Sequence, residues 1–415
     1  MKSVFTILFC FISFFGFSQN SYKQLKAQYD RLRKAEKQDS ALLIAKQLNS
    51  LSFFNEGDTN LNYAVSYRYI GNCFNSLQNI DSAIYYYDFS LKVLTEQHRF
   101  NNKDAIICLH NLGAIYYDKK DYKNTDSIWS IVLELNRKIN CKSVDFIEAL
   151  DNLVMLNNDR EKFDLSEKFM NELLETVKSK FGNESSEYAE RLDQLGQIYI
   201  DSKRFTLADS VFLYSLEIRK KKSYKSDFVK SFNNLGFLYF NVGRYNECEY
   251  YWKQVLEIRR KTIGENDPDY LVTINNLAEL YLSMGKYKEA ERYYKSAFEI
   301  TNKIINKDDP YYAMSLHKIG YFYVIKGDYK SAEPYFKEGI DVIKKFHGES
   351  HPYFAGFLSD LSILYKKMGE FNLAEPYYKK CLEVIGKQEG ETNSDYALAL
   401  NNLAMLYYDM GDYKV

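Results

Sequence analysis

The chain has 415 residues, of which 16% are aromatic and 27% are charged, and its 55 basic side chains nearly balance 56 acidic ones. This composition is typical of a folded, soluble protein. The net charge of −1 leaves no surplus of Lys and Arg to neutralise phosphates, so we expect neither nucleic acid nor an anionic membrane as a partner. The length exceeds what one compact core usually supports, which favours two domains or an array of repeats.

Residues 1–18 have the layout of a secretory signal peptide. Lys2 precedes the apolar run from Val4 to Phe15, and Gly16 and Ser18 supply small residues before a cleavage point. A membrane anchor is the competing interpretation, but this run falls short of the roughly 20 apolar residues that span a bilayer. We therefore predict an exported protein, periplasmic or extracellular, whose mature chain begins near Gln19 and has no integral membrane segment.

The cysteines and histidines indicate neither a disulfide framework nor a metal site. An odd number of cysteines follows the signal segment, without a close pair, and we expect them to be buried small side chains. They are Cys73, Cys108, Cys141, Cys248 and Cys381. None of the 5 histidines has the spacing of metal ligands. We therefore expect no metal and no cofactor.

One pattern recurs along the remaining chain with a period of about 42 residues. In each repeat a small residue follows Leu or Ile and usually precedes a Tyr by three positions. A second residue, usually also small, comes twelve positions after the first, from Ala83 in the earliest of these repeats to Ala374. Ala41 extends this second series towards the N-terminus. We divide the chain into a degenerate first repeat (residues 19–62), divergent repeats (63–225) and clearer repeats (226–415). The first small position is occupied by Gly71, Gly113, Val154, Gly196, Gly236, Ala278, Gly320, Ser362 and Ala404.

Each repeat is predicted to be a pair of helices. From Asp227 to Asn241, apolar residues recur at the spacing of one face of a helix, and a second amphipathic helix follows. The polar loop from Gly264 to Tyr270 then ends the repeat, and Pro268 suits the start of the next helix. Small residues at Gly236 and Cys248 would let the two helices approach closely. Because a single pair cannot bury both of its faces, we predict an all-α, right-handed superhelical solenoid of antiparallel helix pairs.

This spacing of small and aromatic residues resembles the tetratricopeptide repeat, with a unit longer than the usual length of about 34 residues. The long, kinesin-light-chain type is the most similar. The resemblance rests on NNLAELYLSMGKYKEAERYYKSAFEI from Asn275 to Ile300, on HGESHPYFA from His347 to Ala355, and on AEPYF and AEPYY around Pro334 and Pro376. It covers about residues 21–415 and is strongest after Ser231. The divergent repeats depart from it, with Val154 in place of a small residue and Thr125 and Ser166 in place of Ala, so their helices are expected to pack more loosely.

The leading functional hypothesis is an exported, non-enzymatic scaffold that binds a peptide or protein partner in the concave groove of the solenoid. A catalytic site would need a nucleophile beside a base, a metal cluster or a phosphate-binding loop, and the sequence contains none of these arrangements. The alternative is the amino-terminal regulatory part of a protein that resembles CHAT-type, caspase-like peptidases, or of a membrane sensor. In either case the effector domain would lie beyond residue 415.

The resemblance also implies which helix face lines the groove. If the small residue is numbered 8, positions 2, 5, 6, 9, 12 and 13 of the first helix point away from the core of the pair. In the early repeats these positions are mostly acidic, and in the later ones they are apolar and mildly basic, with recurring asparagines. The candidate partner-binding residues are Asp151, Asp193, Asn233, Asn234, Phe237, Asn275, Asn276, Glu279, His317, Tyr321 and Lys366.

Two interpretations of these residues stay open on the sequence alone. Asparagine amides can bond the backbone of an extended peptide because each offers a donor and an acceptor, and in the kinesin-light-chain family such residues line the cargo groove. They could equally bond neighbouring helices, and Phe237 and Phe240 could pack between adjacent repeats. If the groove is used, its two parts suit a partner segment with a basic end and an aromatic or aliphatic end.

The last repeat is incomplete in the sequence. The stretch from Leu403 to Met410 begins it, Gly411 and Asp412 form its turn, and the small residue of its second helix would be position 416. Solenoids normally close with a helix whose outer face is polar. We therefore expect the natural chain to continue past Val415.

Overall fold

The computed structural model describes residues 21–56, 61–96, 99–100, 102–140, 143–221, 225–390 and 392–411. The predicted signal peptide lies outside these residues, as does the predicted end of the last turn. Every regular element within the described ranges is an α-helix, so the all-α fold of stacked helix pairs is confirmed. The chain falls into two compact units, residues 1–204 and 205–415, each of which is described by itself.

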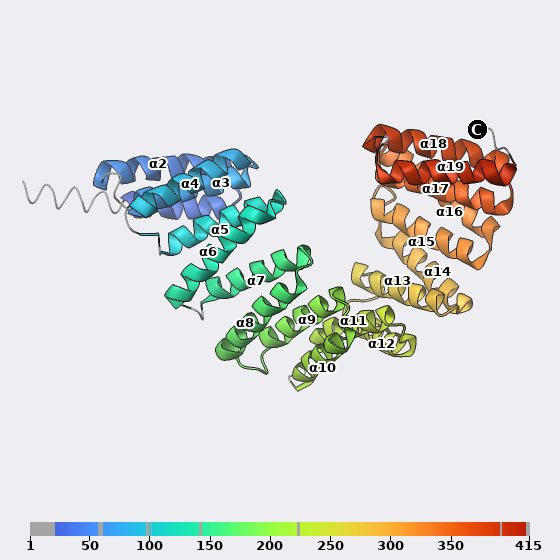
Figure 1. Cartoon of the computed structure of the whole chain (residues 1–415), viewed down its shortest axis with the longest axis horizontal. Coiled ribbons are helices and arrows are strands. Elements are labelled where there is room, and N and C mark those ends of the chain that lie inside the picture. The colour runs from blue at the N-terminus through green and yellow to red at the C-terminus, as the bar shows by residue number, and fades with distance from the viewer. Residues whose placement is uncertain are drawn as a thin grey trace, which may run out of the picture. The chain divides into compact units, whose positions relative to one another are not determined.

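The first unit starts with a helix over residues 21–34. It continues with α2 (Gln38–Glu56), α3 (Leu61–Ser76), α4 (Ile80–Glu96), α5 (Lys103–Asp118), α6 (Tyr122–Asn140), α7 (Val144–Asp159), α8 (Phe163–Phe181) and α9 (Ser186–Asp201). Within this unit, consecutive helices from α2 to α9 pack on one another (Figure 1).

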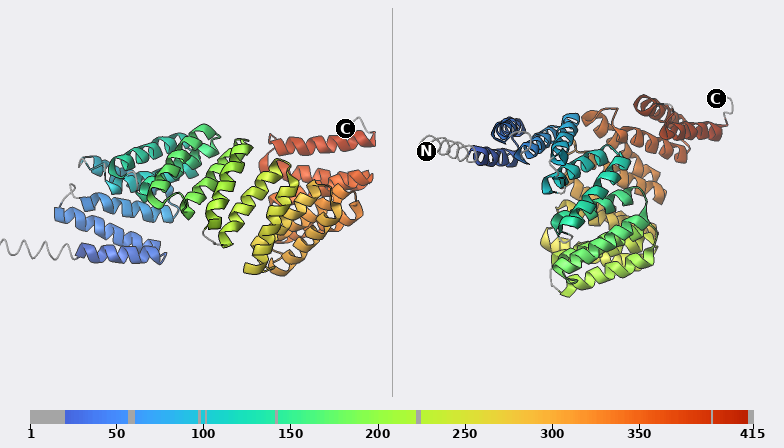
Figure 2. Two further views of the ribbon diagram at one scale, coloured as in Figure 1. Left: turned by 90° about the horizontal axis from the view of Figure 1, so that it is seen from below. Right: turned by 60° about the vertical axis from the view of Figure 1, so that its left-hand side comes forward.

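The second unit has the same organisation. Each of its helices packs on the next one along the chain (Figure 2, left). The helices are α10 (Phe205–Lys221), α11 (Lys225–Asn241), α12 (Tyr245–Thr262), α13 (Pro268–Ser283), α14 (Tyr287–Ile304), α15 (Pro310–Lys326), α16 (Tyr329–Phe346), α17 (Pro352–Met368), α18 (Phe371–Glu389) and α19 (Ser394–Met410).

The predicted helix boundaries agree with local backbone chemistry. The loop after α12 contains Gly264 at φ 87°, a left-handed conformation that favours glycine. Pro268 is the first residue of α13, and the Asp267 side chain accepts a hydrogen bond of 2.8 Å from the backbone N–H of Asp269. The side chain therefore satisfies one of the four N–H groups that a helix start leaves unpaired.

The recurring small residues allow close contact between the two helices of a pair, as predicted. A Cβ atom added at Gly71 would lie 2.8 Å from the Tyr87 ring, and one added at Gly320 would lie 2.7 Å from the Phe336 ring. The aromatic side chain comes sixteen residues after the glycine in both pairs. In the divergent repeats, the polar replacements Thr125 and Ser166 are fully buried, and the Ser166 hydroxyl donates to the Val154 carbonyl at 3.0 Å.

A second recurring contact was not predicted from the sequence. The Tyr three positions after the small residue donates a hydrogen bond to a carboxylate on the helix that precedes its own. In the first unit Tyr199 donates to Glu167 at 2.7 Å, and in the second Tyr281 donates to Glu249 at 2.8 Å. The other bonds of this kind join Tyr239 to Asp209, Tyr323 to Glu291, Tyr365 to Glu333 and Tyr407 to Glu375. We call them the tyrosine–carboxylate bonds.

The cysteines are buried, as predicted, wherever the structure describes them. Cys73, Cys108, Cys248 and Cys381 are free thiols in the core, while Cys141 lies outside the described residues. Burial raises the pKa of the Cys108 and Cys381 thiols to about 11, so these groups stay protonated at neutral pH. They act as small apolar side chains.

Candidate partner-binding surface

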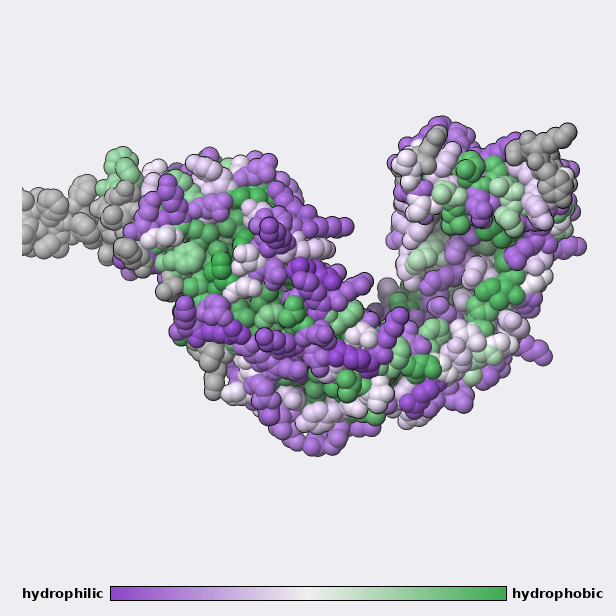
Figure 3. Space-filling model, viewed as in Figure 1, coloured by the Kyte–Doolittle hydropathy of each residue, from purple (hydrophilic) through white to green (hydrophobic). Residues whose placement is uncertain are grey.

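The groove positions of the first helix of each repeat form the surface considered for partner binding. These helices are α3, α5, α7 and α9 in the first unit and α11, α13, α15, α17 and α19 in the second. We call the residues at those positions the groove face of each unit. Figure 3 shows apolar side chains interrupting a mostly hydrophilic surface over the side that it displays.

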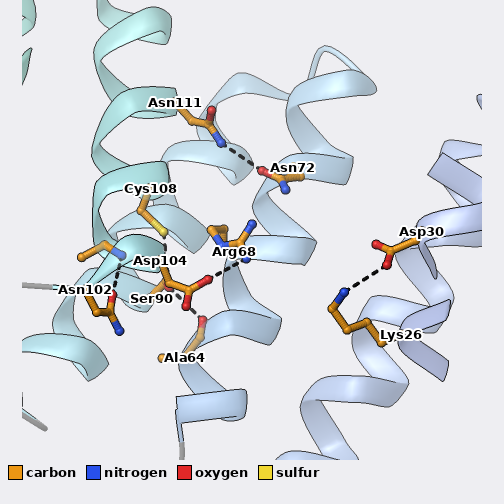
Figure 4. Close-up of polar contacts among 11 residues, drawn as sticks. Lys26, Asp30, Ala64, Arg68, Asn72, Ser90, Asn102, Asp104, Cys108 and Asn111 are labelled. Carbon is orange, nitrogen blue, oxygen red and sulfur yellow. Dashed lines mark hydrogen bonds and ion pairs between the residues drawn. The ribbon is translucent and has the colours of Figure 1, made fainter. Parts of the chain in front are cut away.

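In the first unit, polar residues of the groove face form bonds between the first helices of neighbouring repeats. Arg68 of α3 forms an ion pair of 2.7 Å with Asp104 of α5 and is largely buried. The amide of Asn111 donates to Asn72 Oδ1 at 3.0 Å, between the same two helices (Figure 4). His110 Nε2 of α5 lies 3.4 Å from Glu148 of α7. For these residues the structure supports the interpretation in which groove residues hold neighbouring repeats together.

A hollow of ≈380 Å³ opens between α7 and α9 of the first unit. Apolar side chains form part of its wall, and its polar lining is Asp151, Asn152, Asn158, Arg191, Gln194 and Gln197. The predicted site residue Asp151 thus lines a real cavity, where its carboxylate forms an ion pair of 2.7 Å with Arg191. The sequence pattern did not indicate Arg191, because this residue occupies position 3 of its helix and position 3 is not one of the predicted groove positions.

Burial raises the pKa of Asp151, and the negative charges of Glu148 and Glu190 act in the same direction, against the Arg191 guanidinium. The charged residues that line the hollow are thus one carboxylate and one guanidinium, paired with each other. The other acidic candidate, Asp193, is only 4% exposed. Its side chain is part of the packed interior, and the structure does not present it on the groove face.

In the second unit the groove face exposes large apolar side chains. Phe237 of α11 is 46% exposed and Tyr321 of α15 is 49% exposed. Phe240 behaves differently, because its ring packs 5.6 Å from the Trp252 ring of the same helix pair. Phe240 is thus a packing residue of its own helix pair and not of a contact between adjacent repeats, whereas Phe237 is exposed. Further exposed apolar residues at groove positions are Val272, Ile325, Leu398 and Met405.

The asparagines of the second unit are half-buried at the groove face. The Asn275 amide donates to the Leu271 carbonyl at 3.1 Å, one turn earlier in α13. Asn233, Asn234 and Asn276 are likewise only partly exposed. Asn275 thus uses one of its two amide N–H groups within its own helix, and its carbonyl oxygen keeps acceptor capacity.

Most of the charged candidate residues of the second unit form ion pairs with the first helix of the next repeat. His317 of α15 lies 3.0 Å from Asp360 of α17, and this hydrogen bond raises the pKa of the histidine. The His317 ring also stacks at 6.0 Å on Tyr321. Lys366 of α17 forms an ion pair of 3.0 Å with Asp409 of α19. Glu279, by contrast, is exposed on α13.

The described residues contain no group of three or more His, Cys, Asp or Glu side chains that could hold a metal ion. Within the same part of the chain, every helix is too short or too polar to cross a bilayer. The candidate surface is thus one of hydrogen bonds, charges and exposed rings.

Comparisons with known proteins identify the repeat. A tetratricopeptide-repeat family model matches residues 227–303, 276–345, 311–383 and 353–415. No curated protein matches the chain.

Two solved structures share the fold over most of the chain. The apo form of RapI is 14% identical with a TM-score of 0.55, over 95% of this chain and 99% of that one. The apo form of the quorum sensor NprR from B. thuringiensis is 12% identical with a TM-score of 0.51, over 88% and 99%. A putative kinesin light chain from Podosopora anserina, with nearly identical TPR-like repeats, is 14% identical with a TM-score of 0.35, over 59% and 96%. The family model identifies residues 227–415 as tetratricopeptide repeats, and RapI and NprR show the same helical-repeat fold over most of the chain.

Proposed function

We propose that the chain is an exported scaffold that binds a segment of a protein partner along the groove face. Tetratricopeptide solenoids are interaction scaffolds, since stacked repeats create extended binding surfaces. The observation that carries the proposal is the half-exposure of Phe237 and Tyr321 at positions that point away from their own helix pairs. The similar solved structure of a quorum sensor supports a role in recognition.

The energetics of these rings favour an interface. Apolar surface removed from water stabilises a complex by about 25 cal/mol per Å² before the costs of association. Aromatic side chains are also enriched among the few residues that dominate binding energy. A partner segment with an aromatic or aliphatic end would cover the second unit's groove face.

The test is to select peptides from a random library on the immobilised full chain and to measure their affinity for variants. We expect the paired change Phe237→Ser with Tyr321→Ser to weaken binding by about tenfold or more. Tyr250→Ser is the matched control, because Tyr250 is 59% exposed on α12, a second helix. Full affinity in the paired variant together with a loss in the control would place the binding surface elsewhere.

Export rests on the layout of residues 1–18. A reporter enzyme that is active only outside the cytoplasm should gain activity when it is fused behind these residues. Replacing an apolar residue in the run from Val4 to Phe15 by Asp should abolish that activity. Reporter activity that survives this change would contradict the export proposal.

A further inference from the structure

Four first helices of the second unit begin with the same kind of side-chain cap. In α13, α15 and α19 the cap is Asp267, Asp309 or Asn393, whose side-chain oxygen accepts a hydrogen bond of 2.7 or 2.8 Å from the backbone N–H two residues later. The corresponding residue of α17 is His351, and its Nδ1 atom accepts from the Tyr353 N–H at 3.2 Å. This repeat thus has an imidazole where its neighbours have a carboxyl or amide oxygen.

The cap of α17 depends on protonation in a way that the other caps do not. A carboxyl group and an amide keep an acceptor oxygen in every charge state. Imidazole Nδ1 accepts a hydrogen bond only while the ring is neutral, and it becomes a donor in the imidazolium ion. Protonation of His351 would therefore set two N–H donors against each other at the first turn of α17. It would also place a positive charge at a helix N-terminus, where the helix dipole disfavours a cation.

The surroundings of His351 oppose its charge. Burial lowers the pKa of His351, and so does His347, whose ring centroid lies 5.0 Å from that of His351. Because the pKa is lowered in the folded state, the unfolded chain binds the proton more tightly. The contribution of neutral His351 to stability is therefore present above the ordinary histidine pKa of about 6.5 and is lost as the pH falls below it.

The other charged groups around this loop are paired with one another. Glu349 forms ion pairs with Lys344 of α16 at 2.9 Å and with Lys380 of α18 at 3.0 Å. These two lysines lower the pKa of Glu349, so its carboxylate stays ionised between pH 7 and pH 5. From α15, the uncharged Met314 contacts the Tyr353 hydroxyl. Histidine titration is therefore the charge change that we expect at this junction in that pH range.

We propose that the loop from His347 to His351 is an acid-sensitive joint in the second unit. As the pH falls from 7 to 5, protonation of His351 releases the cap of α17 and loosens the first turn of this helix where it follows α16. The helix also carries Asp360, which bonds His317 of α15 on the groove face. Acid therefore acts on a helix that contributes to the candidate binding surface.

A second histidine responds to acid in the opposite sense. The hydrogen bond to Asp360 raises the pKa of His317, so protonation of His317 stabilises the second unit below about pH 6.5. The two histidines therefore have opposing effects on the free energy of unfolding of this unit. A measurement of the joint must report on the first turn of α17 alone.

The experiment follows the Tyr353 amide of the full chain by NMR hydrogen exchange between pH 7.5 and pH 5, with each rate divided by the intrinsic rate at the same pH. We expect the protection of this amide to fall about fivefold, in step with the titration of the His351 ring signals, because an N-cap is worth about that factor. The Asp395 amide is the internal control. Its cap is Asn393, which does not titrate, so its protection should not change.

Two variants sharpen the test. His351→Asn copies the cap of α19 and should keep the Tyr353 amide protected at every pH. His347→Gln removes the neighbouring charge, so the loss of protection should begin at a higher pH. Constant protection of Tyr353 in the natural chain from pH 7.5 to pH 5 would overturn the proposal. An equal fall in the His351→Asn variant would overturn it as well, since a group other than His351 would then be responsible.

Discussion

The groove faces of the two units differ in what their side chains do, although the helices that carry them follow one pattern. In the first unit, groove residues such as Arg68 and Asn72 bond the first helix of the next repeat, and a polar hollow opens beside Asp151. In the second, Phe237 and Tyr321 stand half-exposed. One repeat architecture thus supports a polar surface and an apolar one.

The two units nevertheless share contacts that do not involve the groove positions. The close contact between a small residue and an aromatic ring occurs in both units, at Gly71 and at Gly320. The tyrosine–carboxylate bonds also occur in both, at Tyr199 and at Tyr281. Because these contacts lie on other faces of the helices, the groove residues can vary between repeats without loss of the fold.

The largest expected change in stability comes from substitutions that test whether the two units share this internal packing. Gly236→Leu in the second unit and Gly113→Leu in the first would each drive a side chain into a tryptophan ring, Trp252 and Trp129 respectively. Each change should lower the free energy of unfolding by about 3 kcal/mol, since close-packed interiors resist added volume. Hydrogen exchange should show lost protection around the substituted repeat, with remote repeats still protected.

Gly356→Ala in α17 is the matched control for these glycine changes. A Cβ added at Gly356 meets no atom within 4 Å, so this variant should be neutral or slightly more stable. Uniform loss of protection across the chain after Gly236→Leu would instead indicate one cooperative core.

The next effect concerns the tyrosine–carboxylate bonds. Tyr281→Phe removes the donor to Glu249, and Tyr199→Phe removes the donor to Glu167. Each should cost about 1.5 kcal/mol, because the lost hydrogen bond has a charged acceptor. The free energy of unfolding in urea measures both, and Tyr250→Phe, at an exposed ring, should cost nothing. A loss in only one unit would show that the bonds do not play the same role in both.

A pH dependence should separate the units further. Hydrogen bonds from Lys295 and Lys326 lower the pKa of Glu291 to about 2, so its stabilising contribution is present above the ordinary carboxylate pKa and disappears as the pH falls towards 2. In the first unit burial raises the pKa of Asp151, so its ionised form destabilises the fold and acid relieves that cost. The two residues should respond to acid in opposite directions.

Urea unfolding between pH 7 and pH 3 can measure this contrast, since the chain has only 2 tryptophans, one in each unit. Glu291→Gln should flatten the acid loss of stability that is reported by Trp252 fluorescence. Asp151→Asn should raise stability at pH 7 as reported by Trp129, although it also removes the charge paired with Arg191. Identical pH profiles for natural and substituted chains would contradict these assignments.

The smallest effect contrasts two phenylalanines of one helix. Phe237→Ser should leave the free energy of unfolding within about 0.5 kcal/mol, because the ring is already half in water. Phe240→Ser should cost about 1 to 2 kcal/mol, because its ring packs on Trp252. Equal costs measured by urea unfolding would mean that Phe237 is also a packing residue.

Sequence reasoning predicted the repeat period, the helix pairs and the tight contacts at the small residues. These features are local or recur at a fixed spacing, so the order of residues is enough to reveal them. The loop of Gly264 and Pro268 was predicted for the same reason, since left-handed glycine and a proline at the first turn act on their own backbone. The tyrosine–carboxylate bonds escaped notice because their partners lie 30 to 32 residues apart on different helices.

Only the tertiary structure decided which groove residues are accessible and which are paired. Helix periodicity gives the direction of a side chain, but not how deeply the neighbouring helix covers it. For that reason Asp193 was counted with Asp151 on the sequence, whereas the structure buries the first and places the second beside a hollow. Arg191 lies 40 residues after Asp151 in the sequence, and the two side chains meet because their helices pack against each other. Sequence spacing alone does not reveal this contact.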